Sequence, residues 1–385
     1  MSKVLILTAG FGEGHNAAAR NLAAAIDDQA GAQASEIADL FAEASPRLNF
    51  LSRLAYLSMI NRAPRLWSAF YGWVNRSEVF PRHLWFLRKE MRLLAARLQE
   101  SSPSAVCSTF PVYGYMADRL RGSGILKAPF YNIVTDSISI NTLWTRPRCT
   151  GWFVPNPETA EVLAKQGVPC SSIHDTGFPV QLFFAREGRK LAPPDLSSGA
   201  RPGVLYILHS GVRHAESTAR RLLAETDWEL TFAVGRDEAL RARLSAAAIG
   251  RRPPASILSW TNQIPRLLLT HHAVISKAGG ATTQEAIAAR CPMVVNQIVP
   301  GQEEGNYELL RRRSIGALAE TPDEVLRVLR HAFSNNGWLW NRWREALDPL
   351  ARVTAAGDIA RQVLATGGES ALRATPAAND ERRHA

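Results

Sequence analysis

The chain contains few cysteines, no long hydrophobic run and little lysine. Four cysteines are scattered over 385 residues without a CxxC or other metal-type spacing, and a chain of this length does not need disulfides to build a core. No stretch approaches the roughly 18 apolar residues of a membrane-spanning helix, and the short apolar run before Gly10 carries no signal-peptide cleavage pattern. We therefore expect a cytoplasmic protein that contacts membranes only peripherally.

The overall composition is that of a globular protein with an excess of positive charge. Apolar residues make up 46% and charged residues 21%, which excludes disordered, collagen-like and coiled-coil classes for all but the ends. The 45 basic against 35 acidic residues give a net charge of +10 and favour an anionic partner: nucleic acid, a phosphorylated ligand or an acidic membrane. Only six of the basic residues are lysine. A GC-rich genome also produces this bias, so the preference for arginine over lysine is not evidence for a particular partner.

Short apolar runs alternate with helical periods twice along the chain, which predicts two parallel α/β domains. The expected strands are Val4–Thr8, Ala105–Ser108, Phe130–Thr135, Gly151–Val154, Gly203–Leu208, Glu229–Val234, Ala273–Ser276 and Met293–Asn296. A polar stretch rich in Pro, Gly and Ser at residues 187–202 predicts a linker between a first domain (1–186) and a second (203–337). Residues 367–385 lack an apolar period and predict a disordered tail.

Residues 46–97 form a basic aromatic segment. It holds ten Arg or Lys against two Glu, a local charge of +8, interleaved with nine aromatic residues. Tyr and Trp favour the headgroup layer and Arg and Lys favour anionic phosphates, so the segment suits a membrane interface. The alternative is that the aromatics belong to the core and the arginines to a solvated face. Binding of nucleic acid is disfavoured because no helix-turn-helix, RNA-recognition or zinc-finger signature is present.

The first candidate site is the glycine-rich turn that follows the first strand and contains Gly10, Gly12, Gly14 and His15. Glycines allow close backbone approach, and the helix start offers unpaired N–H groups to an anionic or polar ligand. An imidazole at this place could act as general base for a hydroxyl nucleophile. A capping role for His15 is equally compatible with the sequence.

The second candidate site follows the strand Ala273–Ser276. Lys277 precedes a Gly279–Gly280 turn whose N–H groups could hold a diphosphate at the positive end of the helix. Glu285, one turn later, suits the two hydroxyls of a ribose, or instead forms a capping box with Thr282. The next strand leads into a cluster of amides and carboxylates matched to the hydroxyls of a hexose: Gln302, Glu303, Glu304 and Asn306.

These motifs resemble those of a known family. The run SWTNQIPRLLLTHHAVISKAGGATTQEAIAARCPMVVNQIVPGQEEGN resembles the donor half of bacterial diacylglycerol glucosyltransferases and plant-type monogalactosyldiacylglycerol synthases of glycosyltransferase family 28. In the first half, AGFGEGHNAAA, IVTDS and DTGFPV resemble the family's glycine-rich loop, Val-Thr-Asp strand end and pre-linker motif, and FAVGRDEALRARL resembles a strand and helix of its donor domain. The similarity covers most of residues 3–320 and is weakest in the basic aromatic segment.

The resemblance implies a GT-B fold, in which two Rossmann-like domains face each other across a cleft. The C-terminal domain would bind UDP-glucose or UDP-galactose, the N-terminal domain would bind a lipid acceptor such as diacylglycerol, and a helix over residues 338–366 would cross back to the first domain. The family is inverting and needs no catalytic metal or other cofactor. The implied place of action is the cytoplasmic face of the cell membrane, with an anionic membrane surface and no nucleic acid as partner.

The resemblance also implies roles for single residues. His15 matches the proposed base or acceptor-positioning histidine, and Asp136 matches the acid that orients it. The remaining positions match the nucleotide-sugar site: Gly12, Gly14, Lys277, Gly279, Gly280, Ala281, Thr282, Glu285, Gln302, Glu303 and Asn306, with Ser210 and Gly211 as weaker candidates for the phosphates.

Three departures from the family pattern bear on the acceptor and phosphate sites. SISINTLW, with Asn141, replaces the usual histidine before Trp144; HSGVRHA lacks the usual Gly-Gly pair; and His272 stands where Asp is common. The sequence leaves open an isoprenoid-linked or soluble acceptor, a sugar-nucleotide epimerase of the same fold, and a nucleotide-sugar binding protein without turnover.

Overall fold

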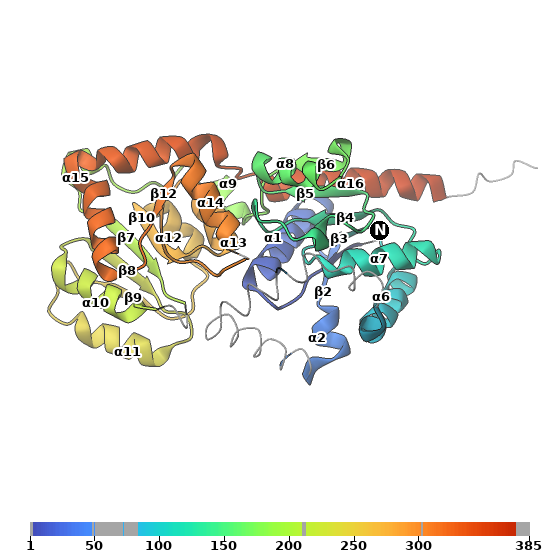
Figure 1. Cartoon of the computed structure of the whole chain (residues 1–385), viewed down its shortest axis with the longest axis horizontal. Helices are drawn as coiled ribbons and strands as arrows, with labels where there is room; N and C mark the ends of the chain where they lie inside the picture. The colour runs from blue at the N-terminus through green and yellow to red at the C-terminus, as the bar shows by residue number, and fades with distance from the viewer. Residues whose placement is uncertain are drawn as a thin grey trace, which may run out of the picture.

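The computed structural model describes residues 3–47, 50, 72, 84–209, 213–301 and 303–374. Within these ranges the chain forms two lobes side by side, each built on a six-stranded sheet with every strand pair parallel (Figure 1). The α/β class and the facing Rossmann-like domains of a GT-B fold are thereby confirmed.

The first sheet has the order β2-β1-β3-β4-β5-β6. Its strands are β1 (Val4–Leu7), β2 (Ser35–Ala38), β3 (Ala105–Ser108), β4 (Phe130–Ile133), β5 (Gly151–Val154) and β6 (Ile173–Asp175). The helices of this half are α1 (Glu13–Ala30), α2 (Leu40–Ala44), α6 (Arg88–Ser101), α7 (Val112–Gly122), α8 (Pro157–Lys165) and α9 (Leu182–Glu187). The 3-10 turn η1 (Leu84–Leu87) precedes α6.

The second sheet has the order β12-β11-β10-β7-β8-β9. Its strands are β7 (Gly203–Ile207), β8 (Glu229–Ala233), β9 (Ser256–Leu258), β10 (Ala273–Lys277), β11 (Met293–Gln297) and β12 (Gly316–Leu318). Its helices are α10 (Ala215–Glu225), α11 (Glu238–Ala247), α12 (Ile264–Thr270), α13 (Gly280–Ala288), α14 (Glu304–Arg313) and the first part of α15 (Pro322–Leu347).

Each central strand is buried on both faces because helices cover both sides of each sheet. Strands β1 (VLIL) and β3 (AVCS) are fully buried. Burial on both faces explains why such parallel strands appear in the sequence as continuous apolar runs. All eight strands expected from the sequence are present. The four that the sequence did not indicate, β2, β6, β9 and β12, are the edge strands of the two sheets, where short and half-exposed residues carry little apolar signal.

The C-terminal helices connect the two lobes, in a way that differs from the single helix expected over residues 338–366. Helix α15 is interrupted at Ser334–Gly337, where Asn335, Asn336 and Gly337 have positive φ. It then ends at Leu347, and α16 (Ala355–Ala374) begins after Pro349, because proline lacks the N–H that would continue a helix. Helix α16 packs along α1 (Figure 1). It continues through residues 367–374, the first part of the segment for which the sequence predicts a disordered tail.

Strand order determines where ligands fit in such sheets. In an open parallel sheet, ligands bind beyond the carboxyl ends of the strands at the point where the order reverses. The reversal lies between β1 and β3 in the first sheet and between β7 and β10 in the second. His15 lies in the first turn of α1, which follows β1, and Lys277 is the last residue of β10, so both sequence motifs lie at reversal points.

Candidate functional site

The imidazole of His15 is fixed by two oxygen atoms. Its Nδ1 lies 2.6 Å from the backbone carbonyl oxygen of Thr109 and 3.0 Å from Oγ1 of Thr135. A carbonyl oxygen can only accept, so Nδ1 carries the proton and donates it to Thr109. Nε2 of the neutral ring is consequently the unprotonated nitrogen, which is the state a general base requires.

Asp136 is the charged partner of this histidine. Burial lowers the pKa of His15, while the carboxylate of Asp136 and the hydrogen bond to Thr109 oppose that shift. Burial likewise raises the pKa of Asp136, against the opposing effects of His15 and of Trp144. The indole Nε1 of Trp144 donates to Oδ2 of Asp136 at 2.9 Å. Burial thus favours the neutral imidazole, and Asp136 is held in a fixed orientation beside it.

Three half-buried phenylalanines adjoin His15. Phe110 meets the imidazole edge-to-face at 5.2 Å between ring centroids. Phe110 also stacks on Phe11 at 5.7 Å and lies 5.8 Å from Phe41. These rings come from the loops after β1 and β3 and from α2, and they form an apolar cluster that contacts the imidazole through Phe110.

On the opposite lobe, the Gly279–Gly280 turn opens helix α13. Gly279 is its N-cap without any side-chain cap, and Thr283 N is bonded to Gly279 O at 2.9 Å. The first N–H groups of the helix, from Gly280 to Thr282, therefore remain available to an anionic ligand. Because Thr282 lies inside the helix, the alternative that Glu285 forms a capping box with it is wrong.

The two motif turns touch each other. A Cβ on Gly14 would lie 3.8 Å from the backbone nitrogen of Ala281, and a Cβ on Gly280 would lie 2.9 Å from the carbonyl oxygen of Thr135. Gly12 is the N-cap of α1. The N-termini of α1 and α13, each with the positive end of its helix dipole, therefore point toward the same region between the lobes. Figure 1 shows α1 and α13 facing each other between the lobes.

Lys277 and Glu303 form an ion pair next to Gly279. The ammonium of Lys277 contacts Oε1 of Glu303, whose Oε2 accepts from Val299 N at 3.0 Å. Glu303 is buried, whereas 29% of the Lys277 side chain is exposed. The carboxylate is thus anchored at one oxygen, and part of the Lys277 side chain is open to solvent.

Glu285 is buried and directed toward the first lobe. Burial raises its pKa to about 7, partly offset by a hydrogen bond with Gln181 and by the charge of Arg20. The sequence expectation pairs Glu285 with ribose hydroxyls; in the structure its carboxyl lies next to Gln181 and α1.

Three amide oxygens near the ends of β10 and β11 are buried without a hydrogen-bond partner: those of Asn296, Gln297 and Asn306. Nδ2 of Asn306 donates to Ala278 O at 3.0 Å, and Nδ2 of Asn296 donates to the Tyr206 hydroxyl at 2.9 Å. These bonds fix the amide orientations, so the oxygens are acceptors for donors such as ligand hydroxyls. Ser210, Gly211 and Gln302 lie outside the described residues.

Two residues that the sequence analysis did not select lie at the same sheet edge. His209, after β7, contacts Ser276 Oγ at 3.1 Å through Nε2, and burial together with Lys277 lowers its pKa to about 4. Trp260 follows β9 and is 66% exposed. The signal for His209 was its position next to Ser210, whereas Trp260 gave no signal because the sequence did not indicate β9, the strand that precedes it.

Within the described ranges, no group of three or more His, Cys, Asp or Glu side chains could hold a metal ion. No helix in the same ranges is long and apolar enough to cross a membrane.

Comparison with known proteins agrees with these motifs. Residues 15–180 match the family described as monogalactosyldiacylglycerol (MGDG) synthase. A processive diacylglycerol β-glucosyltransferase of Bacillus cereus (strain 03BB102) is 25% identical over 373 residues, covering 94% of this chain and 93% of that protein.

Two solved structures share the fold. The glycosyltransferase SnogD from Streptomyces nogalater superposes with a TM-score of 0.56 at 16% identity, covering 96% of this chain and all of that one (100%). The UDP-GlcNAc 2-epimerase from Neisseria meningitidis superposes with a TM-score of 0.57 at 12% identity, covering 94% and 100% of the two chains. The chain therefore has a GT-B fold and is similar over most of its length to processive diacylglycerol β-glucosyltransferases and, over residues 15–180, to the monogalactosyldiacylglycerol synthase family.

Proposed function

We propose that the protein is an inverting hexosyltransferase that moves glucose or galactose from a UDP-sugar to a hydroxyl of diacylglycerol. The observation that carries this proposal is the contact between the two turns. Thr135 hydrogen-bonds His15 through its side chain and meets the Gly280 turn through its carbonyl. Thr135 thereby places His15, the proposed base, close to the N-terminus of α13, the proposed diphosphate site. Hexose transfer from a sugar diphosphate requires these two groups to lie close together.

The donor would bind at the second sheet. Its diphosphate would lie at the start of α13, where N–H groups and the helix dipole favour negative charge, with Lys277 nearby. The indole of Trp260 offers a stacking surface for the base, and Glu285 is the proposed partner of the ribose. The hexose hydroxyls would be bound by Gln302, Glu303 and Asn306; the unpaired amide oxygen of Asn306 supports this.

The chemical step would use His15 as base. Nε2 takes the proton of the acceptor hydroxyl while its oxygen bonds to the anomeric carbon from the face opposite the diphosphate. The bond from that carbon to UDP breaks, and UDP leaves with the electron pair, stabilised by the α13 N–H groups. Asp136 stabilises the imidazolium that forms. This sequence of bonds needs neither a metal nor a cofactor.

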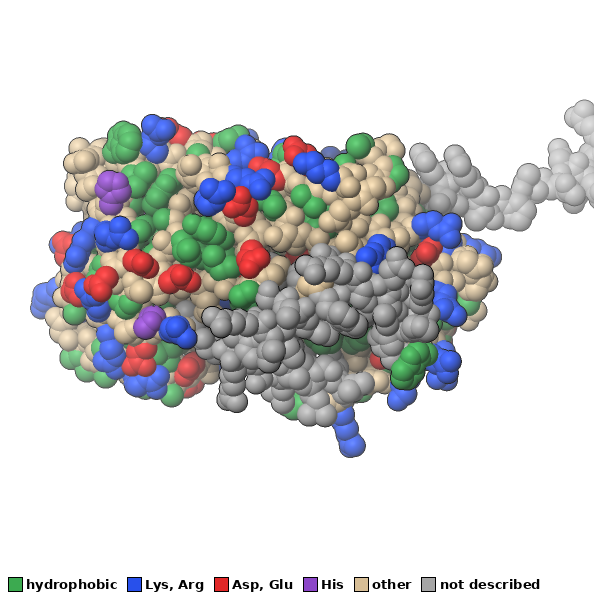
Figure 2. Space-filling model, viewed as in Figure 1, with side chains coloured by type: hydrophobic (Ala, Val, Ile, Leu, Met, Phe, Trp, Pro, Cys, Tyr) green, Lys and Arg blue, Asp and Glu red, His purple; other side chains and the backbone are tan. Residues whose placement is uncertain are grey.

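The acceptor would come from the cytoplasmic face of the membrane. Phe50 and Trp85 are 62% and 67% exposed, and Arg88, Lys89 and Arg92 are exposed on α6 beside Trp85. Figure 2 shows basic side chains at the outer end of this lobe. Aromatic and cationic side chains together suit an anionic headgroup layer, and the phenylalanines beside His15 suit the apolar part of a lipid.

Mass spectrometry of lipids tests the proposal. Purified protein would be incubated with anionic vesicles containing diacylglycerol and a panel of UDP-sugars. A hexosyl-diacylglycerol product is expected and would identify the donor. Transfer only to an isoprenoid-linked or soluble acceptor, an epimerised nucleotide sugar, or binding without turnover would each overturn it.

A further inference from the structure

The loop that carries Asp136 is held by the other lobe. Oγ of Ser137, the next residue, lies 3.1 Å from Nε2 of Gln284 and 3.1 Å from Nδ2 of Asn156. Both amides donate and Ser137 accepts. Gln284 belongs to α13, one residue before Glu285, and all three side chains are buried. A hydrogen bond between the lobes is therefore made directly beside the acid that faces His15.

A second contact fixes the same loop through the backbone. Gly305 of α14 packs against it so closely that a Cβ there would collide with the carbonyl oxygen of Ser137 and the amide nitrogen of Ser139. Only glycine fits at this position without moving the loop. Gly305 lies in the segment Pro300–Asn306, which the sequence assigns to sugar binding.

The loop itself is strained. Ile138 has a φ of +56°, and a β-branched residue enters this region only when its surroundings force it to. Its backbone nitrogen donates to Thr159 Oγ1 at 3.1 Å. A strained turn relaxes when its supports are removed, so the position of Asp136 depends on Ser137, Gln284 and Gly305.

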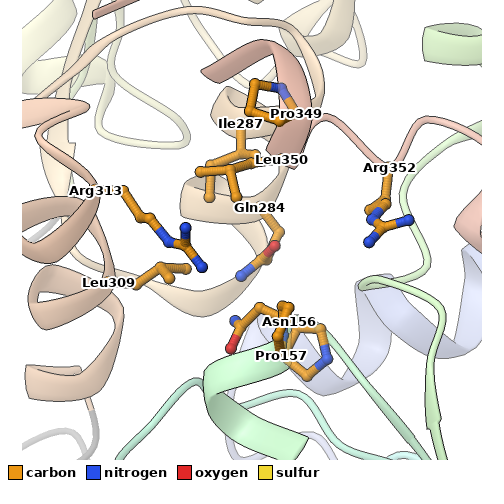
Figure 3. A pocket seen from close by; sticks show the side chains of 10 residues that line it. Asn156, Pro157, Gln284, Ile287, Leu309, Arg313, Pro349, Leu350 and Arg352 are labelled. Carbon is orange, nitrogen blue, oxygen red and sulfur yellow. The ribbon is translucent and has the colours of Figure 1, made fainter. Parts of the chain in front are cut away.

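A cavity adjoins this contact between the lobes. Behind Gln284 lies a cavity of about 180 Å³, lined by Asn156, Gln284, Ile287, Leu309, Arg313 and Arg352 among others (Figure 3). On its rim Arg313 pairs with Glu158 of the first lobe at 2.6 Å. The lobes thus meet here through polar contacts around a cavity, beside a buried apolar cluster that contains residues of both lobes, among them Ala18, Phe178 and Ile287.

We infer that Gln284 and Gly305 are positioning residues, which hold the Asp136 loop beside His15 across the contact between the two lobes. This inference rests on the proposed function and adds to it two residues of the donor-side lobe that position the loop of the acid. The segments that would hold the nucleotide sugar are thus the ones that position Asp136 beside the base.

The test uses the full chain and five variants: Gln284→Ala, Ser137→Ala, their double variant, Gly305→Ala and, as control, Gly122→Ala. A Cβ at Gly122 of α7 meets nothing within 4 Å. Gln284→Ala removes atoms beside an existing cavity and forces no neighbouring atom to move, so it is a milder replacement than Gly305→Ala, whose Cβ would collide with the backbone of Ser137.

The first readout is hydrogen exchange of the backbone amides of residues 136–144, which needs no turnover. Gln284→Ala and Gly305→Ala should increase exchange there, whereas Gly122→Ala should match the wild type. Unchanged exchange in Gln284→Ala would overturn the inference. This result stands even if the wild type transfers no hexose, so failure of the proposed function remains distinguishable.

The second readout separates kcat from donor binding. Gln284→Ala should lower kcat about a hundredfold, the cost of a small misplacement of a catalytic group, with the Kd for the UDP-sugar nearly unchanged. Ser137→Ala removes the bond from Asn156 as well as the bond from Gln284, so it should lower kcat at least as much as Gln284→Ala, and the double variant should lower it no further than Ser137→Ala. A parallel loss of donor affinity, or independent additive losses, would contradict a positioning role.

Discussion

The Nδ1 atom of His15 lies 2.6 Å from the carbonyl oxygen of Thr109, and this contact decides which ring nitrogen is basic. The carbonyl cannot donate, so the proton stays on Nδ1 and the lone pair on Nε2. The ring therefore has one orientation and one tautomer before any substrate arrives.

Removing the imidazole tests that assignment. His15→Ala should lower transfer by about 10²- to 10⁴-fold, the usual contribution of a general base, with little change in UDP-sugar affinity measured by calorimetry. His331→Ala, an exposed histidine of the other lobe, is the matched control. Near-normal turnover by His15→Ala would remove the histidine from the role.

Asp136 should shift the pH profile of the reaction. Burial lowers the pKa of His15 below its ordinary 6.5, and the negative charge of Asp136 opposes that effect. Asp136→Asn removes the opposing charge, so the acidic limb of kcat/KM should move to lower pH. Asp28→Asn, on an exposed residue, should leave the limb in place, and a shift of the Asp136→Asn limb to higher pH would contradict the pairing.

Glu285 should make stability fall as pH rises. Burial raises its pKa from 4.5 to about 7, so the folded state binds more protons than the unfolded state between these values, and stability is lost as pH increases through this window. Glu285→Gln should raise the free energy of unfolding by about 2–3 kcal/mol at pH 8 and change it little at pH 4. Denaturant unfolding at pH 4 and at pH 8 measures these changes. Glu100→Gln, at an exposed position, should leave the free energy of unfolding unchanged at both pH values.

Glu303 pairs with the ammonium of Lys277, and in the proposed donor site it would compete with the diphosphate for that ammonium. Glu303→Gln removes that competition and one negative charge, so UDP alone should bind several-fold more tightly while discrimination between UDP-glucose and UDP-galactose decreases. Titration calorimetry with UDP and with both UDP-sugars measures the two effects. Weaker binding of UDP to Glu303→Gln would show that the pair helps to hold the diphosphate.

Basic residues beside Trp85 should support membrane binding. Replacing Arg88, Lys89 and Arg92 by Gln should weaken binding to anionic vesicles by about 1 kcal/mol per charge, and added salt should reduce the difference. The corresponding triple replacement of Arg220, Arg241 and Arg243 in the other lobe is the control. Equal losses in both variants in vesicle sedimentation would indicate a diffuse effect of net charge only.

Much of the fold could be predicted because buried parallel strands have a continuous apolar pattern. The runs VLIL at β1 and AVIS at the start of β10 are examples. The edge strand β2, with sequence SEIA, has no such pattern because one side is open to solvent. The break of α15 at Asn335 and Asn336 depends on packing of Gly337 against Leu196, a contact that no local pattern shows.

The site could be predicted in its motifs but not in its contacts. The glycine turns and His15 are visible as sequence, whereas the oxygen atoms that orient His15 come from Thr109 and Thr135, each about 100 residues away. Gln284 appears as a helix residue next to Glu285, and only the meeting of the lobes gives it a partner in Ser137. Tertiary contacts of this kind have no sequence period to reveal them.

The most direct test of the central claim is the anomeric configuration of the lipid product. After incubation with the α-linked UDP-sugar and diacylglycerol vesicles, the purified glycolipid would be analysed by proton NMR. In-line attack by a hydroxyl deprotonated at His15 Nε2 predicts a β-hexosyl-diacylglycerol. An α-linked product, or no glycolipid, would contradict the account.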